Sequence, residues 1–331
     1  MTDNNGLSEQ ATMVRNRLAK NAKRLSRWLR ANDISTYRLY DADIPEYSAA
    51  VDVYKSGPQI YAVVQEYAAP KTISPELAQQ RLNDIVAAVG SFLDIPLESV
   101  VIKSRQRQRG KEQYQKSDDP TGREFRVKEG AAQYRLNLHD YLDTGVFLDH
   151  RPMRRYMYEH ARDKKVLNLF CYTATVSVQA ALGGAKQTLS IDLSNTYLDW
   201  ARRNFLLNKL AKRDHRLKKE DCLEWLAVKS KRPLAKYDLI FLDPPSFSNS
   251  KSMESVLDIQ RDHAKLIRQS MRLLERDGTL IFSTNLRKFK LDESGLEKFT
   301  IEDYSAKSLD PDFERNTKIH QCYLIRFKAP E

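Results

Sequence analysis

The sequence predicts an α/β protein whose main domain is a Rossmann-like, doubly wound parallel sheet with an antiparallel last strand. Between residues 165 and 284, five short apolar runs alternate with segments that carry apolar residues at helical spacing. Such alternation is typical of parallel strands joined by right-handed crossover helices. Two later runs, at 296–310 and 320–328, have little helix between them, which predicts a closing antiparallel pair of strands.

The main domain is predicted to span residues 141–331. Its entry segment, 140–152, is expected to be a glycine-containing strand that leads into a helix beginning near Asp149. The five expected strands are VLNLF at 166–170, TLSID at 188–192, RLKKED at 216–221, DLIFLD at 238–243 and TLIFST at 279–284. Because parallel strands deliver their following loops to one edge of a sheet, we expect a ligand site at that carboxyl edge.

Two further parts are predicted ahead of this domain, a basic helix within residues 1–34 and a small α+β domain over 35–140. The small domain should contain a helix at 74–94, with Ser74 as its cap and Pro75 at its first position. Alternating runs predict strands at 36–43, 47–57, 59–68, 98–105, 124–130 and 131–138. No catalytic spacing occurs in this domain, so we expect it to present the substrate.

The composition limits the class of protein. A length of 331 residues allows two domains with separate cores. No run of about 18 apolar residues is present and the polar start lacks signal-peptide character, so a cytoplasmic protein without membrane contact is expected. The cysteines lie far apart and lack metal-ligand spacing; they are Cys171, Cys222 and Cys322. Neither a disulfide nor a bound metal is therefore predicted.

The formal net charge of +11 favours a polyanionic partner, and the charge distribution favours nucleic acid. No acidic residue lies between Gln10 and Asn32, where the basic residues are Arg15, Arg17, Lys20, Lys23, Arg24, Arg27 and Arg30. Apolar residues at helical spacing in this stretch predict one packed face on an otherwise cationic helix. A second basic run, 103–111, is expected in a hairpin tip or mobile loop. Both runs could be ordinary solvated surface, but their lack of acids favours phosphate contact.

The loops after the expected strands carry candidate binding residues. Asp192 ends a strand about 20 residues beyond the first loop, where a carboxylate can accept both hydroxyls of a ribose in NAD, FAD or S-adenosylmethionine. Asp221 ends the next strand and can accept from an adenine amino group, beside the backbone N–H and apolar flank of Cys222. Each aspartate could instead cap the helix behind it. The first loop, 170–175, has no glycine, which disfavours the pyrophosphate of a dinucleotide.

The most specific pattern is DPPSF at 243–247, directly after the expected fourth strand. Its two prolines fix the backbone and remove two N–H donors, so rigid carbonyls and the Asp243 carboxylate would face a ligand. Phe247 offers a flat apolar surface on which a base could stack. The same turn could simply end a strand, but its place in a doubly wound sheet favours a methyltransferase.

These motifs resemble those of a known family. From about Tyr141 to its end, the chain is similar to the class I large-subunit rRNA methyltransferases, which carry LFCYTG-type first loops and DPPSF fourth loops. The stretches RLAKNAKRLSRWLR, YRLYDADIPEY and DYLDTGVFLDHR extend the resemblance over nearly the whole chain. They resemble the carboxyl-terminal K part of the bifunctional rRNA methyltransferases K/L, which methylates guanine N7 in 23S rRNA.

The resemblance implies S-adenosylmethionine as cofactor, with S-adenosylhomocysteine as its product. It implies 23S rRNA, or a large-subunit assembly intermediate, as the partner. It also implies a fused or separate amino-terminal methyltransferase that modifies another guanine at N2.

The resemblance further implies roles for individual residues. Those expected around the cofactor are Asn168, Phe170, Tyr172 and Thr173 on its methionine and ribose side, Asp192 at the ribose, Asp221 and Cys222 at the adenine, and Asp243 and Pro244 in the fourth loop. Thr144, Phe147 and Arg151 would close over it, with Arg151 a candidate partner of its carboxylate. Ala174 stands where the family usually has glycine, so the methionine end is expected to be held somewhat differently.

The target atom can be argued from chemistry. Methylation at pyrimidine C5 needs a cysteine nucleophile, which related enzymes carry in the strand that here reads FSTN at 282–285. Exocyclic amine methylation usually accompanies an aromatic residue directly after the prolines, where Ser246 stands. Guanine N7 carries a lone pair and no proton, so alignment alone can suffice.

We therefore expect two catalytic residues in the fourth loop. Phe247 would stack a flipped guanine, while Asp243 or a nearby carbonyl accepts from its N1–H and amino group. Two alternatives stay open: a cytosine-C5 rRNA methyltransferase of the same fold, and a noncatalytic RNA-binding module that kept the fold.

Overall fold

The structure, a computed structural model, describes residues 6–67, 72–105, 121–210, 214–248 and 256–329. The predicted basic run at 103–111 lies mostly outside these residues. No helix within the described ranges combines the length and apolar character needed to cross a membrane.

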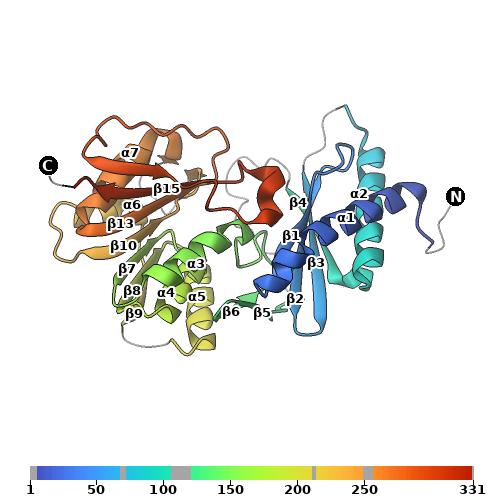
Figure 1. Ribbon diagram of the computed structural model, residues 1–331, viewed down its shortest axis with the longest axis horizontal. Helices are drawn as coiled ribbons and strands as arrows, with labels where there is room; N and C mark the ends of the chain where they lie inside the picture. Colours follow the sequence, from blue (N-terminus) through green and yellow to red (C-terminus); the bar gives the residue numbers. More distant parts are fainter. Residues whose placement is uncertain (1–5, 68–71, 106–120, 211–213, 249–255, 330–331) are drawn as a thin grey trace. The chain divides into compact units, whose positions relative to one another are not determined.

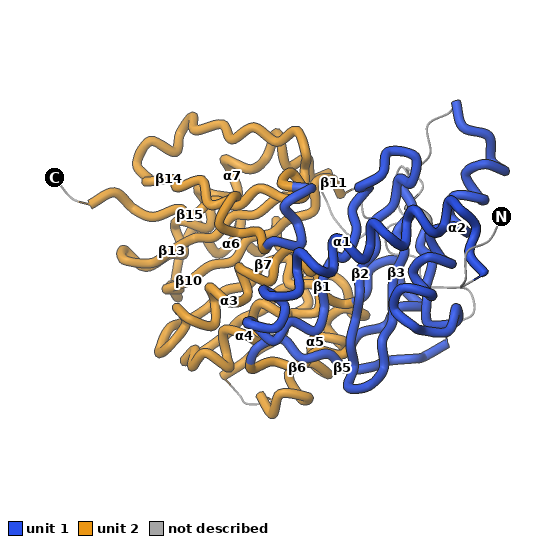
Figure 2. The backbone as a smooth tube through the Cα atoms, turned by 45° about the vertical axis from the view of Figure 1, so that its right-hand side comes forward, with its two compact units in different colours: residues 1–130, 136–144, 311–316 blue, residues 131–135, 145–310, 317–331 orange. Residues whose placement is uncertain are grey.

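The chain forms two compact units (Figure 2). Unit 1 comprises residues 1–130, 136–144 and 311–316, and unit 2 comprises residues 131–135, 145–310 and 317–331. This partition differs from the predicted boundaries, because the basic helix belongs to unit 1 and because residues 311–316 return to that unit from the carboxyl-terminal part of the chain.

The basic helix α1 spans Glu9–Ala31 and begins at Ser8, whose side chain accepts from the N–H of Ala11. Its apolar face, formed by Val14, Leu18 and Leu25, is buried in one core with the strands and with helix α2. This shared core explains why the helix is not a separate part.

The sheet of unit 1 has the order β1-β2-β3-β4. Its strands are β1 (Thr36–Asp41), β2 (Ala49–Ser56), β3 (Gln59–Tyr67) and β4 (Val100–Arg105). The first three confirm predicted strands and are antiparallel to one another, and β4 runs parallel to β3. Helix α2 (Pro75–Leu93) starts at Ser74, which caps it by accepting from Leu77, so the predicted start is confirmed. Strands β5 (Phe125–Glu129) and β6 (Ala132–Leu136) follow the short 3₁₀ turn η1 (Leu97–Ser99) and β4.

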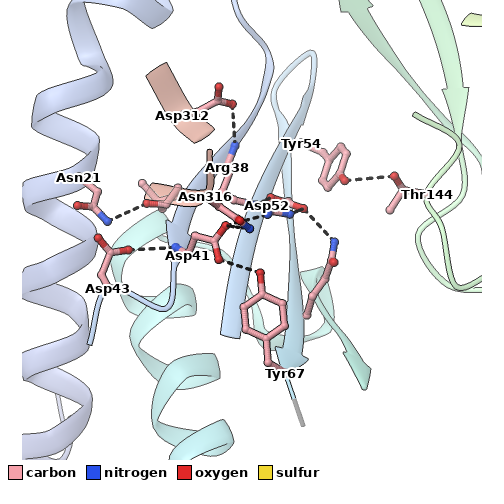
Figure 3. Close-up of polar contacts among 12 residues, drawn as sticks. Asn21, Arg38, Asp41, Asp43, Asp52, Tyr54, Tyr67, Thr144, Asp312 and Asn316 are labelled. Atoms are coloured by element: carbon pink, nitrogen blue, oxygen red, sulfur yellow. Dashed lines mark hydrogen bonds and ion pairs between the residues drawn. The ribbon is translucent and has the colours of Figure 1, made fainter. Parts of the chain in front are cut away.

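A buried ion-pair network fixes the returning segment to β1 (Figure 3). The Arg38 guanidinium donates two hydrogen bonds to the two oxygens of Asp52, at 2.8 and 3.0 Å, and one to Asp41 at 3.0 Å. The backbone N–H of Arg38 donates to Asp312, which lies in the 3₁₀ turn η4 (Pro311–Asn316). The bond to Asp312 is buried and has a charged acceptor, so it ties η4 to β1.

Unit 2 contains a seven-stranded sheet of order β14-β15-β13-β10-β7-β8-β9 (Figure 1). Its strands are β7 (Lys165–Leu169), β8 (Gln187–Asp192), β9 (His215–Lys219), β10 (Tyr237–Leu242), β13 (Leu274–Thr284), β14 (Phe299–Asp303) and β15 (Gln321–Phe327). All neighbours are parallel except at β15, which is antiparallel to both β13 and β14. The predicted fold class is therefore confirmed, including its antiparallel last strand.

Helices cover both faces of this sheet. The helices of unit 2 are α3 (Arg151–His160), α4 (Thr175–Leu182), α5 (Asn195–Leu207), α6 (Cys222–Lys229) and α7 (Ile259–Arg272). On β10, Leu239 and Phe241 pack in the core that includes α3 and α4, whereas Ile240 and Leu242 pack in the core that includes α6 and α7. Burial on both faces accounts for the continuous apolar runs in the sequence.

The strand order reverses between β7 and β10. These two strands are parallel neighbours, with Leu169 opposite Leu242 at their carboxyl ends, and β8 lies on the other side of β7. Ligands of doubly wound sheets bind just beyond such a point. The loops that begin at Phe170 and Asp243 therefore start side by side at the expected edge.

The strand expected in the first part of the segment 140–152 is not formed, whereas the helix expected to begin near Asp149 is confirmed. Residues 140–147 form bends with an isolated β-bridge residue at Tyr141, followed by the 3₁₀ turn η3 (Leu148–His150) and then α3. A side chain from β4 takes up two carbonyls that a strand ladder would have used: the Lys103 ammonium donates to the carbonyls of Tyr141 and Leu142, at 2.5 and 2.8 Å. The Asp140 carboxylate accepts from the N–H groups of Thr121 and Gly122.

Candidate active site

The loop after β7 has a strained backbone. Phe170, Tyr172 and Ala174 have φ of 58°, 52° and 56°, in the left-handed region that side chains disfavour. Strain of this kind persists only where surrounding bonds impose it, and it concentrates at ligand sites. Ala174 thus adopts the backbone conformation that a glycine would adopt at lower cost.

Asp192 imposes part of this shape. Its Oδ2 accepts from the N–H of Tyr172 and its Oδ1 from that of Ser194, both at 2.9 Å. Burial raises the pKa of Asp192, while the bonds from backbone N–H groups oppose that rise. Helix α5 is capped by Ser194, so the alternative that Asp192 caps this helix is wrong.

Asp221 and Cys222 lie at the start of α6. Asp221 caps this helix by accepting from Leu223 at 2.8 Å, so the capping alternative is correct here, and an adenine contact stays a prediction. The Cys222 thiol sulfur accepts from the N–H of Phe170 at 3.2 Å. The start of α6 is thereby joined to the loop after β7.

The DPPSF turn continues directly from β10. The Asp243 side chain is 22% exposed, Pro244 is buried, and Phe247 is 54% exposed. Phe247 begins the short strand β11 (Phe247–Ser248), which pairs with β12 (Leu257–Asp258). The hydroxyl of Ser246 donates to Asn285, just beyond β13, so the loops after β10 and β13 are linked at the same edge.

The segment before α3 lies against the first loop. The ring of Phe147 is 5.1 Å from that of Tyr172, and the hydroxyl of Thr173 donates to the carbonyl of Gly145 at 2.6 Å. A Cβ at Gly145 would come within 2.3 Å of Trp200, so only glycine allows this close approach. Phe147 is therefore held next to the loop that the resemblance assigns to the cofactor.

Three other predicted cofactor residues are engaged elsewhere. Arg151 is buried and paired with Asp310 at 2.9 Å, so its predicted role as partner of the cofactor carboxylate loses its support. Asn168 is buried and donates to Ser177 in α4, which makes it a support of the loop. Thr144 belongs to unit 1, where its hydroxyl contacts that of Tyr54 at 3.2 Å.

One residue that the sequence analysis did not single out lies in the middle of this cluster. His150 is buried, its Nδ1 is 3.8 Å from Asp243 Oδ2, and its ring meets that of Phe147 edge-on. Its place in the sequence between Phe147 and Arg151, two residues that the resemblance assigns to the site, was the available signal.

The arrangement suits an adenosyl ligand without a pyrophosphate. The first loop takes its left-handed turns without any glycine, and it therefore lacks the residues that let a backbone approach a pyrophosphate closely. A carboxylate at the end of β8, on a neighbouring strand, matches the two hydroxyl donors of a ribose. When bound there, S-adenosylmethionine would supply an electrophilic methyl group at a sulfonium.

Comparison with known proteins decides the family. The sequence profile of the S-adenosylmethionine-dependent methyltransferases matches residues 78–306. The chain belongs to this family. S-adenosylmethionine is therefore its cofactor, and the alternative of a noncatalytic RNA-binding module loses its support.

Two relatives share more than half of their aligned residues with this methyltransferase. It is 56% identical over 327 residues to the ribosomal RNA large subunit methyltransferase K/L of Cellvibrio japonicus, and 52% identical over 318 residues to that of a Marinomonas strain. These matches cover 97% and 96% of this chain but only 43% of each relative. The chain thus spans less than half the length of these relatives, and its sequence fits their K part.

Solved structures agree with the fold of this methyltransferase. The structure of the methyltransferase SMU.776, complexed with SAH, has a TM-score of 0.78 and 26% identity, and covers 96% of this chain and 82% of that one. An S-adenosylmethionine-dependent methyltransferase from Streptococcus mutans has a TM-score of 0.75 and 25% identity, with the same coverage of the two chains.

Proposed function

We propose that this methyltransferase transfers a methyl group from S-adenosylmethionine to guanine N7 of 23S rRNA. The two relatives described above are named as ribosomal RNA large subunit methyltransferases, and each matches nearly all of this chain. This supports a large-subunit rRNA substrate.

The observation that carries the choice of atom is the state of the cysteines. All three are free and buried: Cys171, Cys222 and Cys322. Burial raises the pKa of each thiol, so none is a ready nucleophile at neutral pH. Pyrimidine C5 methylation depends on a thiolate that adds to the ring, and the cytosine-C5 alternative is therefore disfavoured.

The loop after β10 supports N7 over an exocyclic amine. Ser246 follows the two prolines and its hydroxyl is bonded to Asn285, while the aromatic residue comes one position later, at Phe247. Guanine N7 needs no base to remove a proton, only alignment with the methyl and the sulfur. Phe247 would stack the guanine and Asp243 would accept from its Watson–Crick edge, which sets that alignment.

The test is the identity of the methylated nucleoside. The protein is incubated with labelled S-adenosylmethionine and 23S rRNA from cells that lack it, and the digested nucleosides are analysed by mass spectrometry. We expect 7-methylguanosine. 5-Methylcytidine, or a guanine methylated at N2, would overturn the proposal.

We further propose a role for α1 in holding the RNA. Four of its basic residues recur at intervals of three and four positions, which places them along one helical face: Lys20, Lys23, Arg27 and Arg30. All four are exposed, whereas Arg24 is paired with Glu314 of the returning segment. A cationic stripe of this kind fits a phosphate backbone.

We propose two further partners for this methyltransferase. One is an assembly intermediate of the large subunit, and the other is an amino-terminal guanine-N2 methyltransferase, fused or separate.

Replacing the four residues of this stripe with glutamine should weaken binding to a 23S rRNA fragment and flatten its salt dependence. Each lost phosphate contact lowers the slope of log K against log salt by about 0.7–0.9, so four lower it by roughly 3. Binding is measured by fluorescence anisotropy from low to moderate salt.

The control removes the same charge from exposed residues at the amino ends of the strands in the unit 2 sheet. These residues are Arg162, Lys165, Lys186 and Lys236. This variant should keep the wild-type slope. Equal effects of the two variants would mean that only net charge matters, and would remove α1 from the proposed RNA contact.

A further inference from the structure

His150 is held on several sides in unit 2. Its Nε2 lies 2.9 Å from the hydroxyl of Ser283 in β13, and its ring stacks on that of His320 at 4.7 Å. The rings of Phe147 and Phe241 meet it edge-on, at 6.3 and 5.9 Å. A ring packed in this way has little freedom to rotate.

The second ring nitrogen of His150, Nδ1, faces Asp243. The distance of 3.8 Å to Oδ2 is too long for a hydrogen bond but short for an electrostatic contact. If Ser283 donates to Nε2, the ring proton is on Nδ1 and points toward the carboxylate, which is the favourable arrangement. The opposite tautomer would set a lone pair against a negative charge, so the surroundings select the first.

His320 stabilises the orientation of His150 through the stacking of the two rings. Its Nδ1 lies 2.7 Å from Asp149 and its Nε2 lies 2.8 Å from the hydroxyl of Ser308, so both ring nitrogens are engaged. Asp149, His150 and His320 are close enough together to suggest a metal. However, the two rings are stacked within 23° of parallel, so their in-plane lone pairs do not converge on one ion. Hydrogen bonding accounts for this cluster better than metal binding.

We propose that His150 is a positioning residue that holds the Asp243 carboxylate in the orientation needed for methyl transfer. The proposal rests on the role proposed above for Asp243. Contacts that are long in a ligand-free site commonly shorten when the substrate binds. On guanine binding, the Nδ1–H of His150 would donate to one oxygen of Asp243 and leave the other for the base.

The neutral state of His150 matters to this role. Burial lowers the pKa of His150 below the ordinary value of 6.5, against the opposing effect of Asp243 and Asp149; the other charged or titratable groups near it are His320 and Arg154. A neutral imidazole adds no positive charge near a sulfonium or near the methylated, cationic guanine. Protonation at acid pH would add that charge, so turnover should fall as pH falls through the pKa of His150.

The test is a double-mutant cycle between His150 and Asp243 in the full chain. We measure kcat for total methyl transfer from labelled S-adenosylmethionine to RNA, and the Kd of the cofactor, for His150→Ala, Asp243→Asn and the double variant. Alone, His150→Ala should lower kcat at least about tenfold, because displacing a catalytic group by about 1 Å can cost 100-fold. In the Asp243→Asn background it should add less than about twofold, with cofactor affinity unchanged throughout.

Two conservative variants keep the test valid if His150→Ala folds poorly. His150→Gln retains a polar group at this position, so its kcat at neutral pH should be close to that of wild type. Glutamine does not titrate, so the decrease in kcat at acid pH that protonation of His150 causes in wild type should be absent. Ser283→Ala removes only the hydroxyl at Nε2 and should lower kcat in the same direction by a smaller factor.

Equal losses from His150→Ala in both backgrounds, or a parallel loss of cofactor affinity, would overturn the proposal and make His150 a packing residue. The methylated atom, mapped separately, distinguishes this from failure of the proposed function. Coupling with methylation at another atom would support the positioning role and refute N7. Methylation at N7 without coupling would refute the positioning role alone.

Discussion

Asp243→Asn is expected to lower kcat for RNA methylation by roughly 30- to 1000-fold while cofactor affinity changes less than about twofold. Methylation at N7 gives the guanine a positive charge, so hydrogen bonds from its N1–H and amino group to a carboxylate are stronger in the transition state than in the ground state. Such charge-assisted bonds contribute about 1.5–3 kcal/mol each. Asparagine retains one oxygen acceptor, so we expect a net loss of about 2–4 kcal/mol, which corresponds to roughly 30- to 1000-fold. Asparagine keeps the shape but not the charge.

The measurements are kcat with saturating RNA and the Kd of S-adenosylmethionine by calorimetry. Asp238→Asn is the matched control, because Asp238 lies near the other end of the same strand, β10, and accepts from the N–H of Lys165 at 2.7 Å. It should leave kcat near wild type. A loss of cofactor affinity as large as the loss of kcat would assign Asp243 to the cofactor instead of the base.

The part of the site that the sequence predicted depends on strand periodicity. Apolar runs that are buried on both faces end at Leu169 and Leu242, and the loops that follow must then lie at one edge of the sheet. For this reason the sequence alone predicts that the loops after β7 and β10 lie side by side.

The parts that the sequence did not predict depend on contacts between distant residues. Arg151 pairs with Asp310, 159 positions away, and no local pattern distinguishes this partner from a cofactor carboxylate. The return of residues 311–316 to unit 1 depends on the buried bond between Asp312 and the backbone of Arg38. The bends over 140–147 likewise depend on Lys103, which lies on β4, far earlier in the chain.

Asp192→Ala is expected to weaken binding of S-adenosylmethionine by about 100-fold or more. Two ribose hydroxyls that donate to a carboxylate contribute about 1.5–3 kcal/mol each, and about 2.7 kcal/mol already corresponds to 100-fold. The variant also removes the acceptor for the N–H of Tyr172, which helps to hold the strained first loop. Asp192→Asn keeps one acceptor and should lose less, about tenfold. Calorimetry measures both, with exposed Asp199→Ala on α5 as control.

The pH dependence of cofactor binding separates the ribose contact from loop support. Because burial raises the pKa of Asp192, its carboxylate takes up a proton at a higher pH than an ordinary aspartate does. The cofactor favours the ionised form, so affinity should be complete above this pKa and fall as pH decreases through it. Asp192→Asn cannot titrate and should lack that fall. If wild type and Asp192→Asn lose affinity in parallel on acidification, the ribose contact is ruled out and Asp192 serves only the loop.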